Sequence, residues 1–267
     1  ELAESLAVPG GPAAPKVKLL PMTVTEREMP APTAPNPAAE MRLALGIDDV
    51  NLAPMIHDFD VSPHLLIYGD AETGKTNLLR YIARAVARHH SDKDARVMFG
   101  DFRRELHDSI PQSHQIEYSV DGETMAKTIQ GIAQMLKKRL PGPEIPPSRL
   151  PKRDWWKGGR LYIVIDAYEL AESSNPLEPL TPLLPQAADI GFHVIVARST
   201  SGAGRSMMST AIRRMWELGT PALLMSCPKG EGSFLGNVKP RTLPVGRGQF
   251  IDRRRNVRLL QTPLVED

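Results

Sequence analysis

The sequence is short of the residues that several common kinds of site require. Its 267 residues include one cysteine, Cys227, so no internal disulfide can form and no thiolate cluster can hold a metal. His64, His107, His114 and His193 are scattered, without the close spacing of a His-Glu-x-x-His zinc site. The Gly-x-Ser-x-Gly pattern of a serine nucleophile is also missing. We therefore expect a protein of a reducing compartment that uses neither zinc nor a covalent serine intermediate.

An excess of one charge and long apolar runs are lacking as well. The 33 basic and 31 acidic residues give a net charge of +2, which offers no broad attraction for DNA or an anionic membrane. No apolar run approaches the ~18 residues that cross a bilayer, and no secretory signal pattern opens the chain. The first residue is Glu1 rather than methionine, which favours a piece of a longer protein, although trimming would look the same. We expect no nucleic-acid partner, and membrane contact only through other segments of a parent chain.

Composition divides the chain into a short first segment and one domain. Residues 1–39 are rich in proline and alanine, which predicts a linker or a strap lying on the domain. Within it, residues 16–24 (KVKLLPMTV) have enough apolar character to dock as an extended strand. Residues 40–267 are long enough to bury the core of one α/β domain, and they contain no internal repeat.

Short apolar runs and amphipathic segments alternate along the domain. Hairpins are predicted at both of its ends, over residues 41–59 and 247–262. Between them we predict strands at 64–68, 96–99, 161–165, 192–197 and 221–226. We predict helices from the loop near 75 to 89, over 125–140 and over 208–218, with a broken helix over 179–190. Such alternation predicts a mainly parallel, doubly wound sheet flanked by helices.

The strongest motif is the glycine-bounded loop that follows the strand at 64–68. Residues 69–76 (GDAETGKT) match G-x-x-x-x-G-K-[ST], whose backbone N–H groups form a phosphate nest at a helix N-terminus. Lys75 would reach the β- and γ-phosphates, and the Thr76 hydroxyl would bind Mg²⁺. The motif predicts ATP and Mg²⁺ as cofactors. The predicted cofactor-binding residues are Gly69, Asp70, Ala71, Glu72, Thr73, Gly74, Lys75, Thr76 and Asn77.

A second motif ends the hydrophobic strand at 161–165. Asp166 stands where P-loop proteins place the carboxylate that holds Mg²⁺, so we predict Thr76 and Asp166 as the metal site and Lys75 and Asp166 as catalytic residues. Ala167 follows, and a methyl group cannot accept a proton from the attacking water. Glu169 is a weaker candidate for that base, because it lies beyond the strand end. The pattern predicts intact nucleotide binding with impaired hydrolysis.

Several other residues admit both a functional and a structural interpretation. Ser199 or Thr200 could sense the γ-phosphate or simply begin a loop. Arg198, Arg205 and Arg247 could reach a neighbouring subunit's phosphate or be surface arginines, whereas 253–255 is typical of a solvated turn.

Two apolar groups are similarly open. The helix carrying Met207, Met208, Ile212, Met215 and Trp216 could receive a partner helix or pack into the core. The pair Trp155 and Trp156 could be an exposed anchor or a lid pinned to the core, and we favour the lid.

These stretches together resemble one family. "HLLIYGDAETGKTNLLR", "DFRREL", "WWKGGRLYIVIDAYEL", "HVIVARSTSGAGRSM" and "EGSFLGNVKPRTLPVGRGQFI" look like the C-terminal ATPase modules of EccC/EssC, the FtsK/SpoIIIE-like ATPases of type VII (ESX) secretion. The resemblance runs from about Lys16 to Leu264. It implies a RecA-like P-loop fold with an N-terminal strap and a C-terminal β-hairpin. Ala167 departs from the paired acids usual in the family, which puts efficient hydrolysis in doubt.

The resemblance also implies a setting. Family members string several such modules after transmembrane helices, work at the cytoplasmic face of the cell membrane, and export small helical-hairpin proteins of the WXG100/Esx class. It implies export substrates, other modules of the same parent and a possible hexamer as partners, and an apolar pocket in a late module for the substrate's C-terminal signal. The leading hypothesis is an ATP-binding module of such a secretion ATPase with weak or no hydrolysis. The alternatives are a fully active ATPase motor and an FtsK-type DNA translocase, against which the near-neutral charge speaks.

Overall fold

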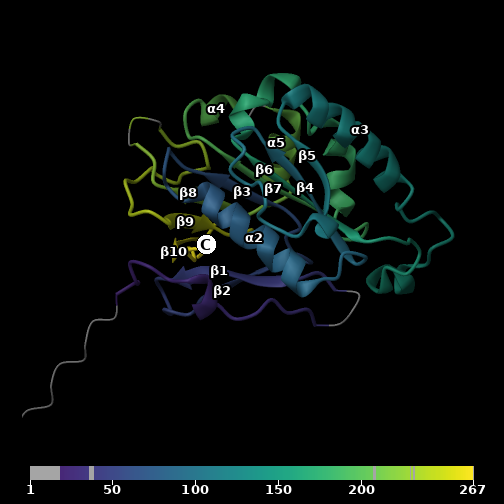
Figure 1. Cartoon of the computed structure of the whole chain (residues 1–267), viewed down its shortest axis with the longest axis horizontal. Helices are drawn as coiled ribbons and strands as arrows, with labels where there is room; N and C mark the ends of the chain where they lie inside the picture. The colour runs from purple at the N-terminus through teal and green to yellow at the C-terminus, as the bar shows by residue number, and fades with distance from the viewer. Residues whose placement is uncertain (1–18, 36–38, 207–208, 229, 231, 267) are drawn as a thin grey trace, which may run out of the picture.

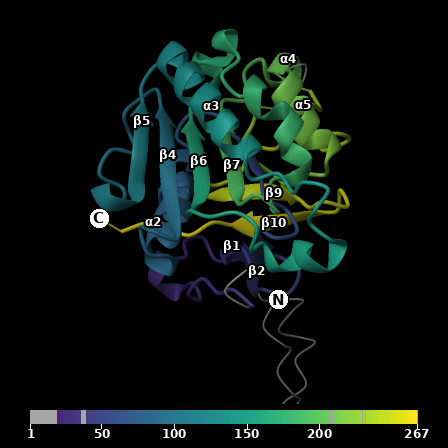
Figure 2. The ribbon, with the colours of Figure 1, turned by 90° about the vertical axis from the view of Figure 1, so that its right-hand side faces the viewer.

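One mixed sheet runs through the whole molecule. The computed structural model describes residues 19–35, 39–206, 209–228, 230 and 232–266. In these residues ten strands form a single sheet in the order β2-β1-β10-β9-β8-β3-β7-β6-β4-β5 (Figures 1 and 2). The strands are β1 (Arg42–Asp48), β2 (Pro54–Asp58), β3 (Leu65–Tyr68), β4 (Ala95–Asp101), β5 (Gln115–Ser119), β6 (Arg160–Asp166), β7 (Phe192–Arg198), β8 (Ala222–Met225), β9 (Arg247–Ile251) and β10 (Val257–Gln261).

The half of the sheet from β8 to β5 is parallel and is covered on both faces. Strands β3 and β7 are buried at every position, as expected for strands between two helical layers. On one face packs α2 (Lys75–His89), which buries Leu78, Ile82 and Val86 in one core. On the other face lie α3 (Gly122–Lys137), η6 (Glu178–Gln186) and α5 (Thr210–Glu217), which share a second core. The remaining short helices are η1 (Glu26–Glu28), η2 (Gln112–His114), η3 (Pro147–Lys152), η4 (Tyr168–Leu170), η5 (Glu172–Ser174) and α4 (Ala203–Ser206).

The other half of the sheet is antiparallel and joins the two ends of the chain. Both predicted hairpins form, as β1–β2 and β9–β10. They are not separate ribbons, because β9 pairs with β8 and β1 pairs with β10. Each hairpin therefore extends the central sheet and gains a buried face that a two-stranded ribbon lacks. The predicted α/β architecture with its strap and C-terminal hairpin is confirmed.

The described part of the first segment, residues 19–35, lies along the domain as a strap. Residues 16–18 of the predicted strand lie outside the described residues, and 19–24 form an irregular stretch. Thr25 makes a parallel bridge with Leu264, and the Leu264 N–H donates to the Val24 carbonyl at 2.7 Å. Val24 is buried there. The expectation of a strand was wrong for the described residues, since Pro21 has no N–H to donate to a ladder.

Two other details differ from the sequence expectation. Strand β5, at the edge of the parallel half, had not been predicted; its residues QIEYS are only partly buried and give no apolar run. The broken helix is the 3₁₀ helix η6, because Pro182 and Pro185 remove the N–H groups that an α-helix needs. Among the described residues, no helix is both long and apolar enough to cross a bilayer.

Candidate nucleotide-binding site

The loop between β3 and α2 has the geometry of a phosphate cradle. Gly74 adopts φ +100°, and a side chain at Gly69 would place its Cβ 2.5 Å from Thr73 Oγ1, so both positions require glycine. Helix α2 begins at Lys75, and no side chain caps its first turn. The free N–H groups of that turn and the helix dipole favour an anion at this point.

A cavity of about 480 Å³ opens beside this loop, at the carboxyl ends of the parallel strands. Its walls hold five carboxylates, from Asp70, Glu72, Glu105, Asp166 and Glu169, against the two cations of Lys75 and Arg103. A triphosphate entering alone would meet this acidic excess, and a divalent cation would offset it. The other lining residues are Ala71, Thr73, Gly74, Thr76, Asn77, Ala167, Ser199 and Val245.

Three predicted site residues converge at one wall of the cavity. Thr76 Oγ1 donates a hydrogen bond to Asp166 Oδ2 at 2.5 Å. Asp166 is only 2% exposed, and this burial raises the pKa of its carboxyl group above the usual range. Burial likewise lowers the pKa of Lys75, whose Nζ donates to the Asp70 carbonyl at 2.6 Å.

The Thr76 and Asp166 oxygens fit a magnesium ion that takes most of its ligands from elsewhere. The described residues contain no group of three acidic, histidine or cysteine side chains able to hold a metal. Mg²⁺ in nucleotide sites characteristically binds one or two protein oxygens, with phosphate oxygens and water completing its octahedron. The pair therefore suits a metal that arrives with a nucleotide.

The residues after Asp166 decide what base is present. Ala167 is buried with φ 51° and ψ 42°, and its N–H donates to Asp166 Oδ1 at 2.8 Å. Glu169 lines the cavity, although its strand-end position had made it a weaker candidate. Its Oε2 accepts from the Ser199 N–H at 2.9 Å, and its Oε1 lies 3.6 Å from Arg103 Nη2. Glu169 thus faces the nucleotide space with both oxygens engaged.

Asn77, the last residue of the predicted loop set, uses its side chain elsewhere. Its Nδ2 donates to the Pro263 carbonyl at 2.7 Å, and its Oδ1 accepts from the Val265 N–H at 2.9 Å. Asn77 therefore ties the first turn of α2 to the C-terminal segment that pairs with the strap. Ser199 lines the cavity, whereas Thr200 is buried and does not.

Two of the three arginines considered as fingers are engaged within the chain. Arg198 is 2% exposed, and its Nη1 lies 3.1 Å from Glu172 Oε1. Arg247 donates to the Leu20 and Pro21 carbonyls of the strap. The side chain of Arg205 lies outside the described residues.

The turn at 253–255 is more engaged than its sequence indicated. The Arg253 Nη1 donates to the Val61 carbonyl at 2.8 Å, while the Arg254 side chain is exposed. Arg255 stacks on Trp216, with its Cζ 3.3 Å from the ring centroid. All three arginines are exposed, as expected for a solvated turn, and Arg253 and Arg255 in addition fix the hairpin to its neighbours.

The apolar groups serve mainly as core. Ile212 and Met215 on α5 are fully buried, whereas Met207 and Met208 lie outside the described residues. Trp155 and Trp156 donate their Nε1–H groups to the Arg139 and Asp189 carbonyls at 2.8 and 2.9 Å. This pair is pinned to the domain, but it precedes β6 and so lies at the amino ends of the strands. It does not line the nucleotide cavity.

Sequence reasoning missed three residues of the cavity wall. Arg103 and Glu105 follow β4, and Val245 precedes β9. The first two could have been found, because the carboxyl ends of neighbouring parallel strands meet at one edge. Val245 had no local signal: Gly246 donates its N–H to the Thr73 carbonyl at 2.9 Å, which brings the two distant loops together.

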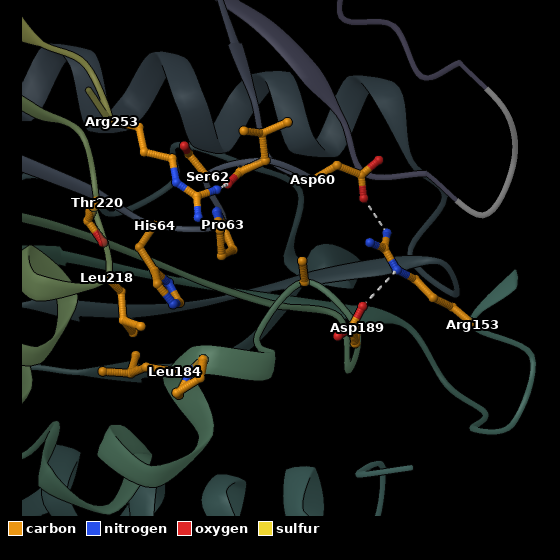
Figure 3. Close-up of a pocket in the computed structure, with 14 residues that line it drawn as sticks. Asp60, Ser62, Pro63, His64, Arg153, Leu184, Asp189, Leu218, Thr220 and Arg253 are labelled. Carbon is orange, nitrogen blue, oxygen red and sulfur yellow. Dashed lines mark hydrogen bonds and ion pairs between the residues drawn. The ribbon is translucent and has the colours of Figure 1, made fainter. Parts of the chain in front are cut away.

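Further cavities lie outside this site, including the following two. One of about 250 Å³, lined by His64, Arg153, Asp189 and Arg253 among others, opens at the amino ends of the parallel strands (Figure 3). The other, of about 580 Å³, lies between α5, the segment 235–241 and the β9–β10 hairpin.

Comparison with known proteins supplies relatives. No protein-family model matches the chain. It is 44% identical over 255 residues to the ESX secretion system protein EccC of Thermomonospora curvata, covering 94% of this chain and 19% of that protein. It is 35% identical to the ESX-4 secretion system protein EccC4 of Mycobacterium tuberculosis, covering 94% and 20%. The chain thus spans about a fifth of the length of these relatives.

Solved structures agree. The cytoplasmic domain of T. curvata EccC superposes with a TM-score of 0.87 at 42% identity, covering 97% of this chain and 30% of that one. A structure of ATPases 2 and 3 of the same protein, in complex with a signal sequence peptide, gives 0.86 at 42% identity, covering 97% and 46%. Identity of this order, maintained over nearly the whole chain and accompanied by the same fold, shows that the chain belongs to the EccC/EssC family as one of its C-terminal, FtsK/SpoIIIE-like P-loop ATPase modules.

Proposed function

We propose that the chain is the nucleotide-binding module of a type VII (ESX) secretion ATPase, binding Mg²⁺-ATP tightly and hydrolysing it slowly or not at all. The observation that carries this proposal is the contrast at the end of β6. Asp166 is assembled with Thr76 at 2.5 Å, while the next residue, Ala167, has no group that can take a proton. In this proposal, Asp166 supports nucleotide binding, whereas Ala167 occupies the position where a base for hydrolysis would be expected.

Each binding residue has one task in this proposal. The N–H groups of residues 72–76 surround the phosphates, and Lys75 neutralises charge on the β- and γ-phosphates. Thr76 and Asp166 orient the Mg²⁺ ion, which supplies the positive charge that the acidic cavity lacks. The raised pKa of Asp166 means that an arriving cation relieves the cost of its buried charge.

A competent ATPase remains the second candidate, and one observation favours it. Glu169 lines the cavity, so a shift of its carboxylate away from Ser199 and Arg103 would supply a general base.

Calorimetry with Mg²⁺-ATP alongside steady-state hydrolysis, on the wild type and on Lys75→Ala, tests the proposal. We expect tight binding in the wild type, loss of at least about tenfold in affinity in Lys75→Ala, and turnover well below ~1 s⁻¹. Lys127→Ala, an exposed site on α3, is the matched control and should change nothing. Turnover of ~1 s⁻¹ or more that depends on both Lys75 and Glu169 would establish the second candidate instead.

We also propose that the 580 Å³ cavity receives an export signal. Its floor includes Trp216, Leu235 and Ile251, and its rim carries three cations, from Lys239, Arg241 and Arg255. An extended C-terminal peptide of a WXG100/Esx protein, with apolar side chains and carboxylates, is complementary to that surface. The relative solved with a signal sequence peptide supports this choice of occupant.

Fluorescence anisotropy with the labelled signal sequence peptide of the T. curvata complex provides the test. We expect Val257→Asp, which places a charge at the cavity wall on β10, to weaken peptide binding by about tenfold or more and to leave ATP affinity unchanged. Val50→Asp, at an exposed turn, is the control. A wild type that does not bind, or equal effects of the two variants, would contradict the proposed occupant.

The parent setting is part of the same proposal. We place the module at the cytoplasmic face of the membrane, beside other ATPase modules of its parent chain and in a possible hexamer, on the basis of its family.

A further inference from the structure

We propose that Arg103 contacts the terminal phosphate of the bound nucleotide from within the same chain and makes the site discriminate ATP from ADP. This inference rests on the proposed nucleotide-binding function. Of the described residues that line the cavity, Arg103 is the one arginine. Its guanidinium offers five donors in a planar fork, which matches a phosphate better than an ammonium group does.

The loop that carries Arg103 is fixed from below by a buried carboxylate. Asp101, the last residue of β4, is 0% exposed. Its Oδ1 accepts from the Glu105 N–H at 3.1 Å, and its Oδ2 accepts from the Leu106 N–H at 2.6 Å and the Tyr118 hydroxyl at 2.5 Å. These bonds hold 101–106 as a tight turn, with Arg103 at its exposed side.

The same loop is tied to the nucleotide-binding helix. Arg80, on α2, donates from Nη2 to the Glu105 carbonyl at 2.7 Å. Leu106 is fully buried in the core that α2 shares. The loop and the phosphate-binding turn of α2 are therefore held in a set relation, so Arg103 is presented to the cavity by a rigid support.

Arg103 lies at the side of the cavity where the end of a triphosphate must be. Asp101 and Asp166 are partners in the β4–β6 register, so Arg103 follows the strand end next to the metal-binding carboxylate. The charge of Arg103 also acts with the dominant effect of burial to lower the pKa of Lys75. Val245 lies instead next to Thr73 of the loop 69–76, because the neighbouring Gly246 donates its N–H to the Thr73 carbonyl.

Glu169 pairs with the Arg103 guanidinium, and a bound terminal phosphate would replace Glu169 as the partner of this arginine. The Glu169 Oε1 lies 3.6 Å from Arg103 Nη2, and the Arg103 side chain is 52% exposed. A terminal phosphate carries more charge than a carboxylate and accepts a bidentate pair of hydrogen bonds, so it competes well for this arginine. ADP, which ends one phosphate earlier, leaves the Arg103–Glu169 pair in place.

Among the described side chains, the two other arginines considered for this task are engaged elsewhere in the chain. Arg198 is buried against Glu172, and Arg247 holds the strap. Neither lines the cavity.

Calorimetric titration of Arg103→Gln with Mg²⁺-ATPγS and with Mg²⁺-ADP tests the inference. We expect the ATPγS affinity to fall by about tenfold or more, the ADP affinity to change by less than about twofold, and Arg103→Lys to recover part of the loss. Retained ADP binding shows that the variant is folded. Arg104→Gln removes the neighbouring exposed arginine, which does not line the cavity, and should leave both affinities unchanged.

The failures are distinguishable. A wild type that binds neither nucleotide overturns the proposed function itself. A wild type that binds both, with Arg103→Gln weakening ATPγS and ADP by the same factor or changing neither, overturns the role of Arg103 alone.

Discussion

The two ends of the parallel strands each bury a carboxylate, and the two groups respond in opposite ways. Asp166 at the carboxyl ends is 2% exposed, and its pKa is raised. Glu40 at the amino ends is 0% exposed, and its pKa is lowered. Burial acts to raise both pKa values, so the difference comes from the partners that the fold supplies.

At the amino ends the fold supplies the Glu40 carboxylate with cationic partners. Burial is the largest influence on its pKa, but the charges of His193, Arg160 and Arg153 together with the His193 hydrogen bond outweigh it. Glu40 Oε2 lies 2.8 Å from Arg160 Nε and 3.0 Å from His193 Nε2. Arg153 continues the network to Asp60 and Asp189 at the wall of the smaller cavity (Figure 3).

At the carboxyl ends the fold gives the Asp166 carboxylate too few partners to offset the effect of burial on its pKa. It receives one hydroxyl and one N–H, from Thr76 and Ala167, and the nearby Lys75 charge does not overcome burial. A buried carboxylate without enough partners is stabilised in its charged form when a cation binds next to it. The comparison shows how to separate a structural charge cluster from a ligand site: the structural one is satisfied within the chain.

Glu40→Gln removes the central carboxylate of the amino-end charge network, and it should have the largest effect on stability. Loss of the charge removes the buried carboxylate that Arg160 contacts at 2.8 Å, whereas Arg153 keeps Asp60, so we expect a loss of about 3–5 kcal/mol in the free energy of unfolding. Urea denaturation measures it. Glu217→Gln, which removes an exposed partner of Arg213 and Arg214, should cost no more than about 1 kcal/mol. Equal costs for the two variants would remove the distinction drawn here.

Lowering the pH should destabilise the fold through two buried histidines near the amino ends, His57 and His64. Burial lowers the pKa of His57 to about 4 and that of His64 to about 3. Their unfolded pKa is near 6.5, so the unfolded chain takes up protons first, and stability is lost as the pH falls below that value. The expected loss is on the order of 2 kcal/mol per histidine by pH 5. His64→Gln should flatten the pH dependence of the urea midpoint; an unchanged slope would contradict the assignment.

Asp166→Asn should have the smallest effect on stability, with the opposite sign. Because the folded pKa of Asp166 is raised, its buried charge opposes folding at neutral pH, and this opposition fades as the pH falls through the folded pKa. The neutral amide should raise the stability of the nucleotide-free protein by on the order of 1 kcal/mol, or a few degrees in Tm. The same variant should lose the Mg²⁺-dependent part of ATP affinity. A lower Tm without nucleotide would show that Asp166 is a structural group.

Local pattern determined the nucleotide-binding half of the site. The loop 69–76, the strand before it and the helix after it form one continuous stretch, so spacing alone predicts the nest. Ala167 is likewise visible in the sequence as the residue where a base is missing. The alternation of strands and helices predicted the parallel half of the sheet except for β5, because period and apolar content are properties of neighbouring residues and β5 has no apolar run.

Tertiary structure decided the rest. Glu40 is satisfied by residues 113, 120 and 153 positions away, and Arg103 meets Glu169 across 66 positions, so neither arrangement leaves a local trace. The pairing of β1 with β10 depends on which edges remain open after the central strands have packed. The physical reason is that hydrogen-bond geometry and side-chain period act over a few residues, whereas partners for buried charge are set by which apolar faces close on one another.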